Sequence, residues 1–131
     1  MKYLLDTNVW LWSIGPVERI NARGQEILND GSEELYLSAV SCLEISIKAQ
    51  MGKLHLPSSP PQCIPLFMAK QRLLPLPVTH DHALKVYGLP MHHRDPFDRL
   101  ILAQALIEEM TVLTSDRTFG KYPVNVLWCG E

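Results

Sequence analysis

Four acidic residues, Asp6, Glu44, Asp98 and Asp116, are the leading candidates for chemistry in this sequence. Carboxylates brought within a few ångströms raise one another's proton affinity and resist ionising together. A hard divalent cation such as Mg2+ or Mn2+ relieves that repulsion, prefers oxygen ligands and commonly shares its coordination shell with phosphates. Such an ion orients and deprotonates a water for attack on phosphorus and stabilises the departing oxygen. The four acids therefore predict metal-dependent hydrolysis of a phosphodiester.

Three of these acids also have purely structural explanations. Asp6 and Asp116 each have the position of a cap before a helix or a short turn, and Ser41-x-x-Glu44 has the spacing of a capping box. Caps are far commoner than catalytic carboxylates, so each acid taken singly favours the structural explanation. Together with Asp98 they favour a functional cluster, because all four fall at one edge of the predicted sheet.

Asp98 has the weakest structural explanation of the four. Asp95-Pro96 already supplies the capping residue and the first helical position. Helical spacing places Asp98 on one face with Ile101 and Leu102, an apolar face that is expected to pack on the sheet. A carboxylate at the edge of such a face is costly unless a cation compensates its charge.

The elements that must position these acids alternate along the chain. Strands are expected at residues 3–5, 35–37, 111–114 and 124–128, with a short or edge strand at the proline-containing residues 74–78. Helices are expected from residue 7, over residues 21–29, 39–51 and 64–73, after residue 79, and over residues 96–110. The proline- and serine-rich residues 56–65 predict a bend within one domain. This alternation predicts an α/β fold with helices on both faces of a mostly parallel sheet, whose ligands collect beyond the carboxyl ends of the strands.

The composition is that of a globular protein. A chain of 131 residues fits one domain, expected over residues 1–131, and 47% apolar residues exclude a disordered tail. No apolar run approaches the roughly 20 residues of a membrane-spanning helix, and the first charges come too early for a secretory signal, so a cytoplasmic protein is expected. Cys42, Cys63 and Cys129 lack the spacing of a metal or redox site and are expected to be reduced.

The formal net charge of -2 argues against a general cationic nucleic-acid binder. If four of the 14 acidic residues occupy a metal pocket, ten remain against 12 Lys and Arg, and the rest of the molecule is slightly basic. An RNA substrate is therefore electrostatically permitted.

Other polar and aromatic residues are weaker candidates. His92-His93-Arg94 has the chemistry of a metal or phosphate cluster, but a solvated loop is the commoner explanation. Arg99 has the chemistry to hold a phosphate or a surface carboxylate. Trp10 and Trp12 are candidates for base stacking, although such residues are more often core or interface anchors.

The acids belong to an ordered set of motifs that covers nearly the whole chain. The motifs are Leu5-Asp6-Thr7-Asn8, Ser38-x-x-Ser41-x-x-Glu44-Ile45-x-x-Lys48-x-x-x-Gly52-Lys53-Leu54, His93-Arg94-Asp95-Pro96-Phe97-Asp98-Arg99 with Ala103-Gln104-Ala105, and Leu113-Thr114-Ser115-Asp116. This ordered set resembles the PIN-domain toxins of VapBC toxin-antitoxin systems. The run from Asp95 to Arg99 is its most specific part.

The resemblance implies a three-layer α/β/α PIN fold and a Mg2+- or Mn2+-dependent endoribonuclease that acts as the toxin of a type II toxin-antitoxin pair. It also implies a homodimer and a VapB-like antitoxin whose C-terminal segment crosses the acidic groove, where an antitoxin Arg or Lys should bind. The implied catalytic and metal-binding residues are Asp6, Glu44, Asp98 and Asp116. The candidate substrate-binding residues are Asn8, Arg99 and Ser115.

Three alternatives remain open at the level of sequence. A phosphatase of the haloacid dehalogenase type would use Asp6 as its nucleophile, but it requires a second Asp where Asn8 stands. A receiver-like signalling domain requires a phospho-accepting Asp after the middle strand, and only Asp81 is near. The third alternative is a catalytically silent PIN-fold binding module, against which the complete set of acids argues.

Overall fold

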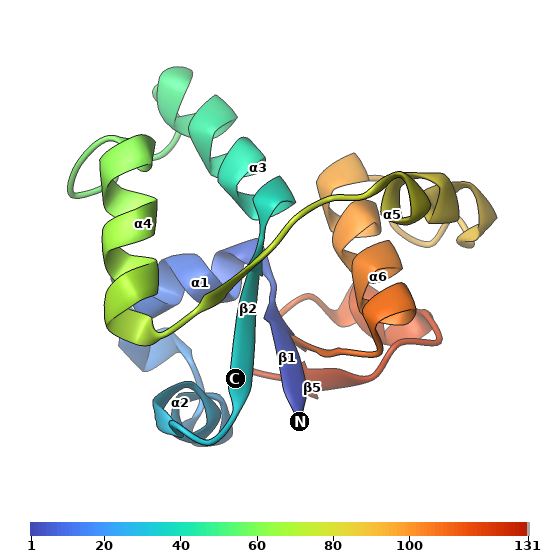
Figure 1. Cartoon of the computed structure of the whole chain (residues 1–131), viewed down its shortest axis with the longest axis horizontal. Coiled ribbons are helices and arrows are strands. Elements are labelled where there is room, and N and C mark those ends of the chain that lie inside the picture. The colour runs from blue at the N-terminus through green and yellow to red at the C-terminus, as the bar shows by residue number, and fades with distance from the viewer. Residues whose placement is uncertain (131) are drawn as a thin grey trace.

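The centre of the molecule is a five-stranded sheet, seen in a computed structural model that describes residues 1–130 (Figure 1). The strands are β1 (Lys2–Leu5), β2 (Glu34–Ser38), β3 (Leu74–Leu76), β4 (Thr111–Thr114) and β5 (Val126–Trp128). Their order across the sheet is β3-β2-β1-β4-β5, and every neighbouring pair runs parallel. The predicted α/β class, the parallel sheet and the edge position of β3 are confirmed.

Helices cover both faces of this sheet (Figure 1). In the described chain the α-helices are α1 (Thr7–Ser13), α2 (Ala22–Asn29), α3 (Ala39–Gln50), α4 (Pro60–Gln71), α5 (His80–Lys85) and α6 (Pro96–Glu108). Short 3-10 helices are η1 (Val17–Arg19), η2 (Val86–Gly88) and η3 (Arg117–Lys121). Helices α1, α2 and α4 lie on one side and α5 and α6 on the other, so the three-layer α/β/α arrangement is confirmed. Within residues 1–130, no helix combines the length and apolarity needed to cross a membrane.

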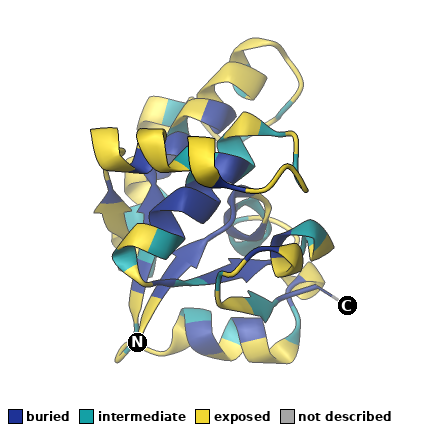
Figure 2. Cartoon of the chain, turned by 90° about the vertical axis from the view of Figure 1, so that its right-hand side faces the viewer, coloured by how far each residue is buried: buried dark blue, intermediate teal, exposed yellow. Residues whose placement is uncertain are grey.

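Alternation of side chains along β1 divides the core into two parts. Tyr3 and Leu5 pack with Trp10 of α1 on one face, whereas Leu4 packs with Ile101 of α6 on the other. Successive strand residues point to opposite faces, so a sheet covered on both sides requires a continuous apolar run. Figure 2 shows the result, with buried strands between helices whose outer surfaces are exposed. Trp10 is fully buried, which makes it a core anchor rather than a surface for base stacking.

Successive strands are added on one side of β1 first and then on its other side. β1 pairs with β2 on one side and with β4 on the other, and later strands are added outward from each. In open parallel sheets such a switch point leaves a crevice beyond the carboxyl ends of the two central strands. The register pairs Leu5 with Leu113, so Asp6 and the residues that follow Thr114 reach the same edge.

Two longer helices begin at this edge because side chains cap them. The Ser38 hydroxyl accepts the N–H of Val40 at the start of α3, and Asp95 Oδ1 accepts two N–H groups in the first turn of α6. Such caps satisfy first-turn donors that have no helical partner. Pro96 takes the first helical position, where its missing N–H costs nothing. Both caps expected from the sequence are confirmed, and they bring Glu44 and Asp98 to the edge of the sheet.

The expected start of the fourth helix was wrong. Helix α4 begins at Pro60 rather than near Ile64, so part of the proline-rich segment is helical instead of a bend. Pro60 and Pro61 occupy the first turn, where proline loses no hydrogen bond and its fixed φ suits the helix. Proline therefore marks the beginning of this helix, not the end of the loop.

A buried hydrogen-bonded pair joins α6 to the edge of the sheet. The Ser38 hydroxyl donates to Gln104 Oε1 at 2.5 Å, and Gln104 Nε2 donates to the carbonyl oxygen of Pro77 at 3.2 Å. Neither Ser38 nor Gln104 is exposed to solvent. The pair fixes the helix that carries Asp98 against the strand end from which α3 begins.

Replacing Gln104 with Leu should lower the free energy of unfolding by about 2 kcal/mol, because the buried Ser38 hydroxyl loses its acceptor and the Pro77 carbonyl loses its donor. Urea denaturation followed by circular dichroism measures this change. The matched control is Gln62→Leu on the exposed surface of α4, which should change the value by less than about 0.5 kcal/mol. Equal effects of the two substitutions would show that the buried pair has no special role.

Candidate metal centre

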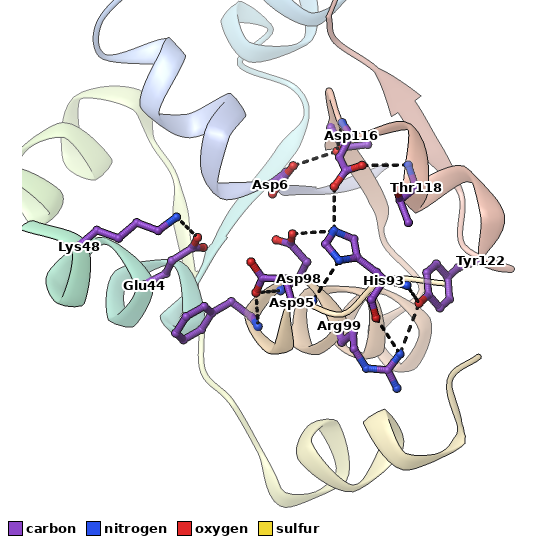
Figure 3. Close-up of polar contacts among 12 residues, drawn as sticks. Asp6, Glu44, Lys48, His93, Asp95, Asp98, Arg99, Asp116, Thr118 and Tyr122 are labelled. Atoms are coloured by element: carbon purple, nitrogen blue, oxygen red, sulfur yellow. Dashed lines mark hydrogen bonds and ion pairs between the residues drawn. The ribbon is translucent and has the colours of Figure 1, made fainter. Parts of the chain in front are cut away.

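Asp6 lies at the carboxyl end of β1 within the acidic cluster (Figure 3). Its side chain is buried, and its Oδ2 accepts a hydrogen bond from Thr114 Oγ1 at 2.9 Å. Burial, with smaller contributions from the charges of Asp116 and Glu44, raises the pKa of Asp6 to about 6 despite that hydrogen bond. Asp6 precedes α1 but makes no side-chain capping bond. Capping therefore does not explain this residue.

Asp98 lies in the first turn of α6 and faces the other acids (Figure 3). Burial raises its pKa to about 8, and the charges of Asp6, Asp95, Glu44 and Asp116 act in the same direction. A helix N-terminus favours negative charge. The raised pKa of Asp98 therefore means that burial and the neighbouring acids outweigh this effect. Asp98 is the acid at which the crowding of negative charge is most severe.

Asp116 follows β4 and is already supplied with hydrogen-bond donors. Burial alone would raise its pKa, but the N–H of Thr118 and the ring of His93 lower it below the usual value. Asp116 Oδ1 accepts the Thr118 N–H at 2.9 Å, which is the cap of a short turn expected from the sequence. Its second oxygen faces His93. Asp116 thus combines a local structural role with a place in the cluster.

Glu44 reaches the cluster from α3. Lys48, one turn later, donates to Glu44 Oε2 at 2.6 Å, and the charge of Glu44 acts on the pKa of both Asp6 and Asp98. Glu44 Oε1 is buried and has no hydrogen-bond partner in the described structure. The capping-box explanation of Glu44 was wrong, because Ser41 lies inside α3 and pairs with the hydroxyl of Thr7 instead.

His93 lies in the site, although the sequence favoured a solvated loop over a metal or phosphate cluster for His92-His93-Arg94. Its Nε2 lies 2.8 Å from Asp116 Oδ2 and 2.9 Å from Asp98 Oδ2. One ligand-type atom from each of the three residues lies within 4.8 Å of the others. The sequence signals were the His92-His93-Arg94 run itself and the position of His93 just before a capped helix that starts at the sheet edge. Its neighbour His92 is exposed and packs edge-on against Tyr122.

Arg99 has a structural place that the sequence did not indicate. Its side chain is buried, and its guanidinium donates to the carbonyl oxygens of Val86, Leu89, Pro90 and His93. These donors hold the segment before α6, so the geometry does not support the expected contact with substrate. Asn8 is exposed at the start of α1 and Ser115 is partly buried after β4, so both retain access to the edge.

The donor set fits a hard divalent cation. The charges of Glu44 and Asp116 raise the pKa of both Asp6 and Asp98. Lys48 forms an ion pair with Glu44. Mg2+ and Mn2+ prefer such oxygen donors. The unpaired, buried oxygen of Glu44 is the kind of atom that a cation would satisfy.

The fold and the acids define an α/β protein with an acid-rich centre at the switch point of its sheet, a place where phosphorylated ligands bind. The chain belongs to the PIN-domain family, because the PIN-domain family model matches residues 3–125. PIN domains are generally nucleases that use divalent metals. The phosphatase and receiver-like alternatives are therefore not favoured. No curated protein is similar enough in sequence to match the chain.

Several solved structures share this fold over almost their whole length. VapBC2 from Rickettsia felis, bound to a promoter DNA fragment, has 18% identity and a TM-score of 0.75, covering 98% of this chain and 99% of that chain. DNA-bound VapBC from Salmonella typhimurium has 19% identity and a TM-score of 0.69, covering 97% of both chains. VapBC-5 from Mycobacterium tuberculosis has 17% identity and a TM-score of 0.61, covering 99% of this chain and 98% of that chain. The predicted likeness to VapBC PIN-domain proteins is confirmed.

Asp98→Asn should stabilise the metal-free protein at pH 8 by about 2 kcal/mol and have little effect at pH 4. The pKa of Asp98 is raised from 3.8 to about 8, so the folded state retains a proton that the unfolded state releases. The contribution of this proton to the free energy of unfolding is fully present below pH 4 and is lost as the pH rises towards 8. A neutral amide avoids this loss.

Urea denaturation in EDTA at the two pH values measures the effect. The control is Asp81→Asn, an exposed position on α5, which should show no stabilisation that grows with pH. An Asp98→Asn variant that is equally stable relative to wild type at both pH values would show that Asp98 is not under charge repulsion.

Proposed function

We propose that this chain is a Mg2+- or Mn2+-dependent endoribonuclease that hydrolyses RNA phosphodiester bonds. The observation that carries the proposal is the convergence of four carboxylates at the switch point of a PIN fold. The proposed metal-binding and catalytic residues are Asp6, Glu44, Asp98 and Asp116. Carboxylates held so close together require compensation, and a divalent ion supplies it in the form that phosphodiester hydrolysis uses.

The surrounding residues orient these carboxylates before any substrate arrives. A bound divalent ion would supply an activated water and stabilise the leaving oxygen. Thr114 holds Asp6 through its hydroxyl, and the N–H of Thr118 holds Asp116. Such partners of ligand side chains fix their orientation and support metal affinity. Burial of Asp6 and Glu44 keeps bulk water from screening the interactions among the charges.

Basic residues beside the acids supply a path for the RNA backbone. Arg94 and Arg117 are exposed and adjoin His93 and Asp116 in the chain. The guanidinium of Arg117 lies 4.5 Å from the ring centre of Trp128. Guanidinium groups bind phosphate oxygens through paired hydrogen bonds. Asn8 and Ser115 are further proposed contacts to substrate.

The same proposal makes the chain the toxin of a type II pair. The similar VapBC-5 belongs to a family of toxin-antitoxin systems, and an Arg or Lys of a VapB-like antitoxin would satisfy the acidic cluster here. Leu43, Ile47 and Met51 are exposed on one face of α3, as expected for a surface that receives an apolar partner helix. We extend the proposal to a single PIN domain over residues 1–131 that forms a homodimer in the cytoplasm.

Asp98→Asn and Asp6→Ala should each reduce Mn2+-dependent RNA cleavage by at least about a hundredfold, because each removes a proposed ligand. Purified protein incubated with total RNA and Mn2+ gives the measurement, and EDTA should stop cleavage until Mg2+ or Mn2+ is restored. The control is Glu26→Gln, which removes an exposed acid on α2 and should cleave like wild type. Cleavage that survives EDTA would rule out the proposed chemistry. A folded chain that binds Mn2+ but cleaves no RNA would instead indicate a silent binding module.

Expression of the wild-type chain without an antitoxin should arrest bacterial growth, whereas equal expression of the Asp98→Asn variant should not. Colony counts after induction, with protein levels checked by immunoblot, provide the measurement. Normal growth of cells that contain folded, cleaving enzyme would reject the toxin role while leaving the nuclease proposal intact.

A further inference from the structure

His93 connects two of the proposed metal ligands (Figure 3). Its Nε2 donates to Asp116 Oδ2 at 2.8 Å, and Asp98 Oδ2 lies 2.9 Å from the same nitrogen. These acids come from separate parts of the chain, α6 and the segment after β4. In the chain up to residue 130, no other side chain makes a hydrogen bond or ion pair with both. The position of the His93 ring therefore affects the spacing of the Asp98 and Asp116 carboxylates.

The other ring nitrogen determines what kind of partner His93 is. Nδ1 accepts the N–H of Asp95 at 3.2 Å, so it carries a lone pair. In a neutral imidazole the hydrogen is then on Nε2, which makes Nε2 a donor without a lone pair for a metal. The short distances among His93, Asp98 and Asp116 would otherwise suit a metal with a nitrogen ligand. The hydrogen bond from Asp95 favours a donor instead.

Buried contacts hold His93 in this orientation. The Tyr122 hydroxyl accepts the N–H of His93 and donates to the carbonyl oxygen of Pro90, each at 2.8 Å. Arg99 donates to the carbonyl oxygens of Pro90 and His93. The ring packs edge-on against Phe119, with 5.9 Å between centroids. Both the backbone and the ring of His93 are therefore fixed by the protein interior.

We infer that His93 is a positioning residue of the acidic centre, holding Asp98 and Asp116 at ligand spacing through its Nε2–H without binding the metal itself. The inference rests on the proposed function. When Asp98 is ionised it repels Asp116, and a donor shared between the two carboxylates offsets part of that repulsion. Without this donor we expect Asp98 and Asp116 to move apart. A cation must then bring them back to ligand spacing when it binds. Residues that orient metal ligands in this way commonly contribute to affinity as strongly as some ligands do.

His93→Ala should weaken Mn2+ binding by about tenfold or more, because the donor is lost. Gln carries an amide nitrogen at about the reach of imidazole Nε2, so His93→Gln should restore most of the affinity, whereas the shorter Asn should not. The matched control is His92→Ala, because His92 is exposed and its ring packs against Tyr122 rather than pairing with an acid. Titration of Mn2+, followed by the electron paramagnetic resonance signal of the free ion, measures each dissociation constant. Circular dichroism checks that every variant is folded.

A spectroscopic measurement on the wild-type chain separates a donor from a ligand. Long-range proton–nitrogen correlation spectra should show His93 with a protonated Nε2 and a bare Nδ1, both without metal and with Mg2+. Pulsed paramagnetic resonance of the Mn2+-bound protein should show no directly coordinated nitrogen. A proton that moves to Nδ1 on addition of Mg2+, or a coordinated nitrogen that disappears in His93→Gln, would overturn the inference in favour of a metal ligand.

The remaining outcomes distinguish failure of the inference from failure of the proposed function. If Asp98→Asn loses Mn2+ binding while His93→Ala binds like wild type, the metal centre stands and the positioning role is wrong. If the wild-type chain binds no Mn2+, both are wrong. If the Ala and Asn variants lose affinity and the Gln variant keeps it, the donor role is supported.

Discussion

Repulsion among carboxylates at the carboxyl end of β1 is the constraint on which the rest of the site depends. Asp6 and Asp98 both have a pKa raised by burial and by their acidic neighbours. Part of this repulsion is offset by a hydrogen bond from Thr114 to Asp6, by hydrogen bonds from Thr118 and His93 to Asp116, and by the pairing of Lys48 with Glu44. Lys48 is nearly half exposed, so solvent weakens its contribution. These contacts leave part of the negative charge uncompensated, since the pKa of Asp6 and Asp98 stays raised. The proposed divalent ion would compensate the rest.

The fold brings these acids together because the ends of two strands, β1 and β4, and the starts of two helices, α3 and α6, meet at one edge of the sheet. β1 is central in the sheet, so both of its neighbours deliver chain to the same crevice. Ser38 and Asp95 begin α3 and α6 at that edge, and each cap lies within two turns of an acid of the cluster. The helix-capping residues Ser38 and Asp95 therefore do more than begin their helices. They set the distance between the charges that α3 and α6 carry, Glu44 and Asp98.

The sequence predicted what depends on local patterns and failed where the contact is between distant segments. Apolar runs predicted the strands, and Asp95-Pro96 predicted the start of α6, because periodicity and caps act over a few residues. The place of Arg99 could not be predicted, since its carbonyl partners belong to a loop whose path exists only in the folded chain. The sequence offered His93 only as a weaker candidate for the same reason. Its two acids lie on elements that meet only through the topology of the sheet.

The four acids are not equivalent, and their differences couple metal binding to pH. Asp116 receives donors on both oxygens and has a lowered pKa, so it is ionised before a cation arrives. Asp98 has a pKa of about 8, so near neutral pH it carries a proton that a metal must displace. Metal binding at such a site releases protons and strengthens as the pH rises. Asp116 therefore offers a charge that is already present, whereas Asp98 contributes one only as the ion binds.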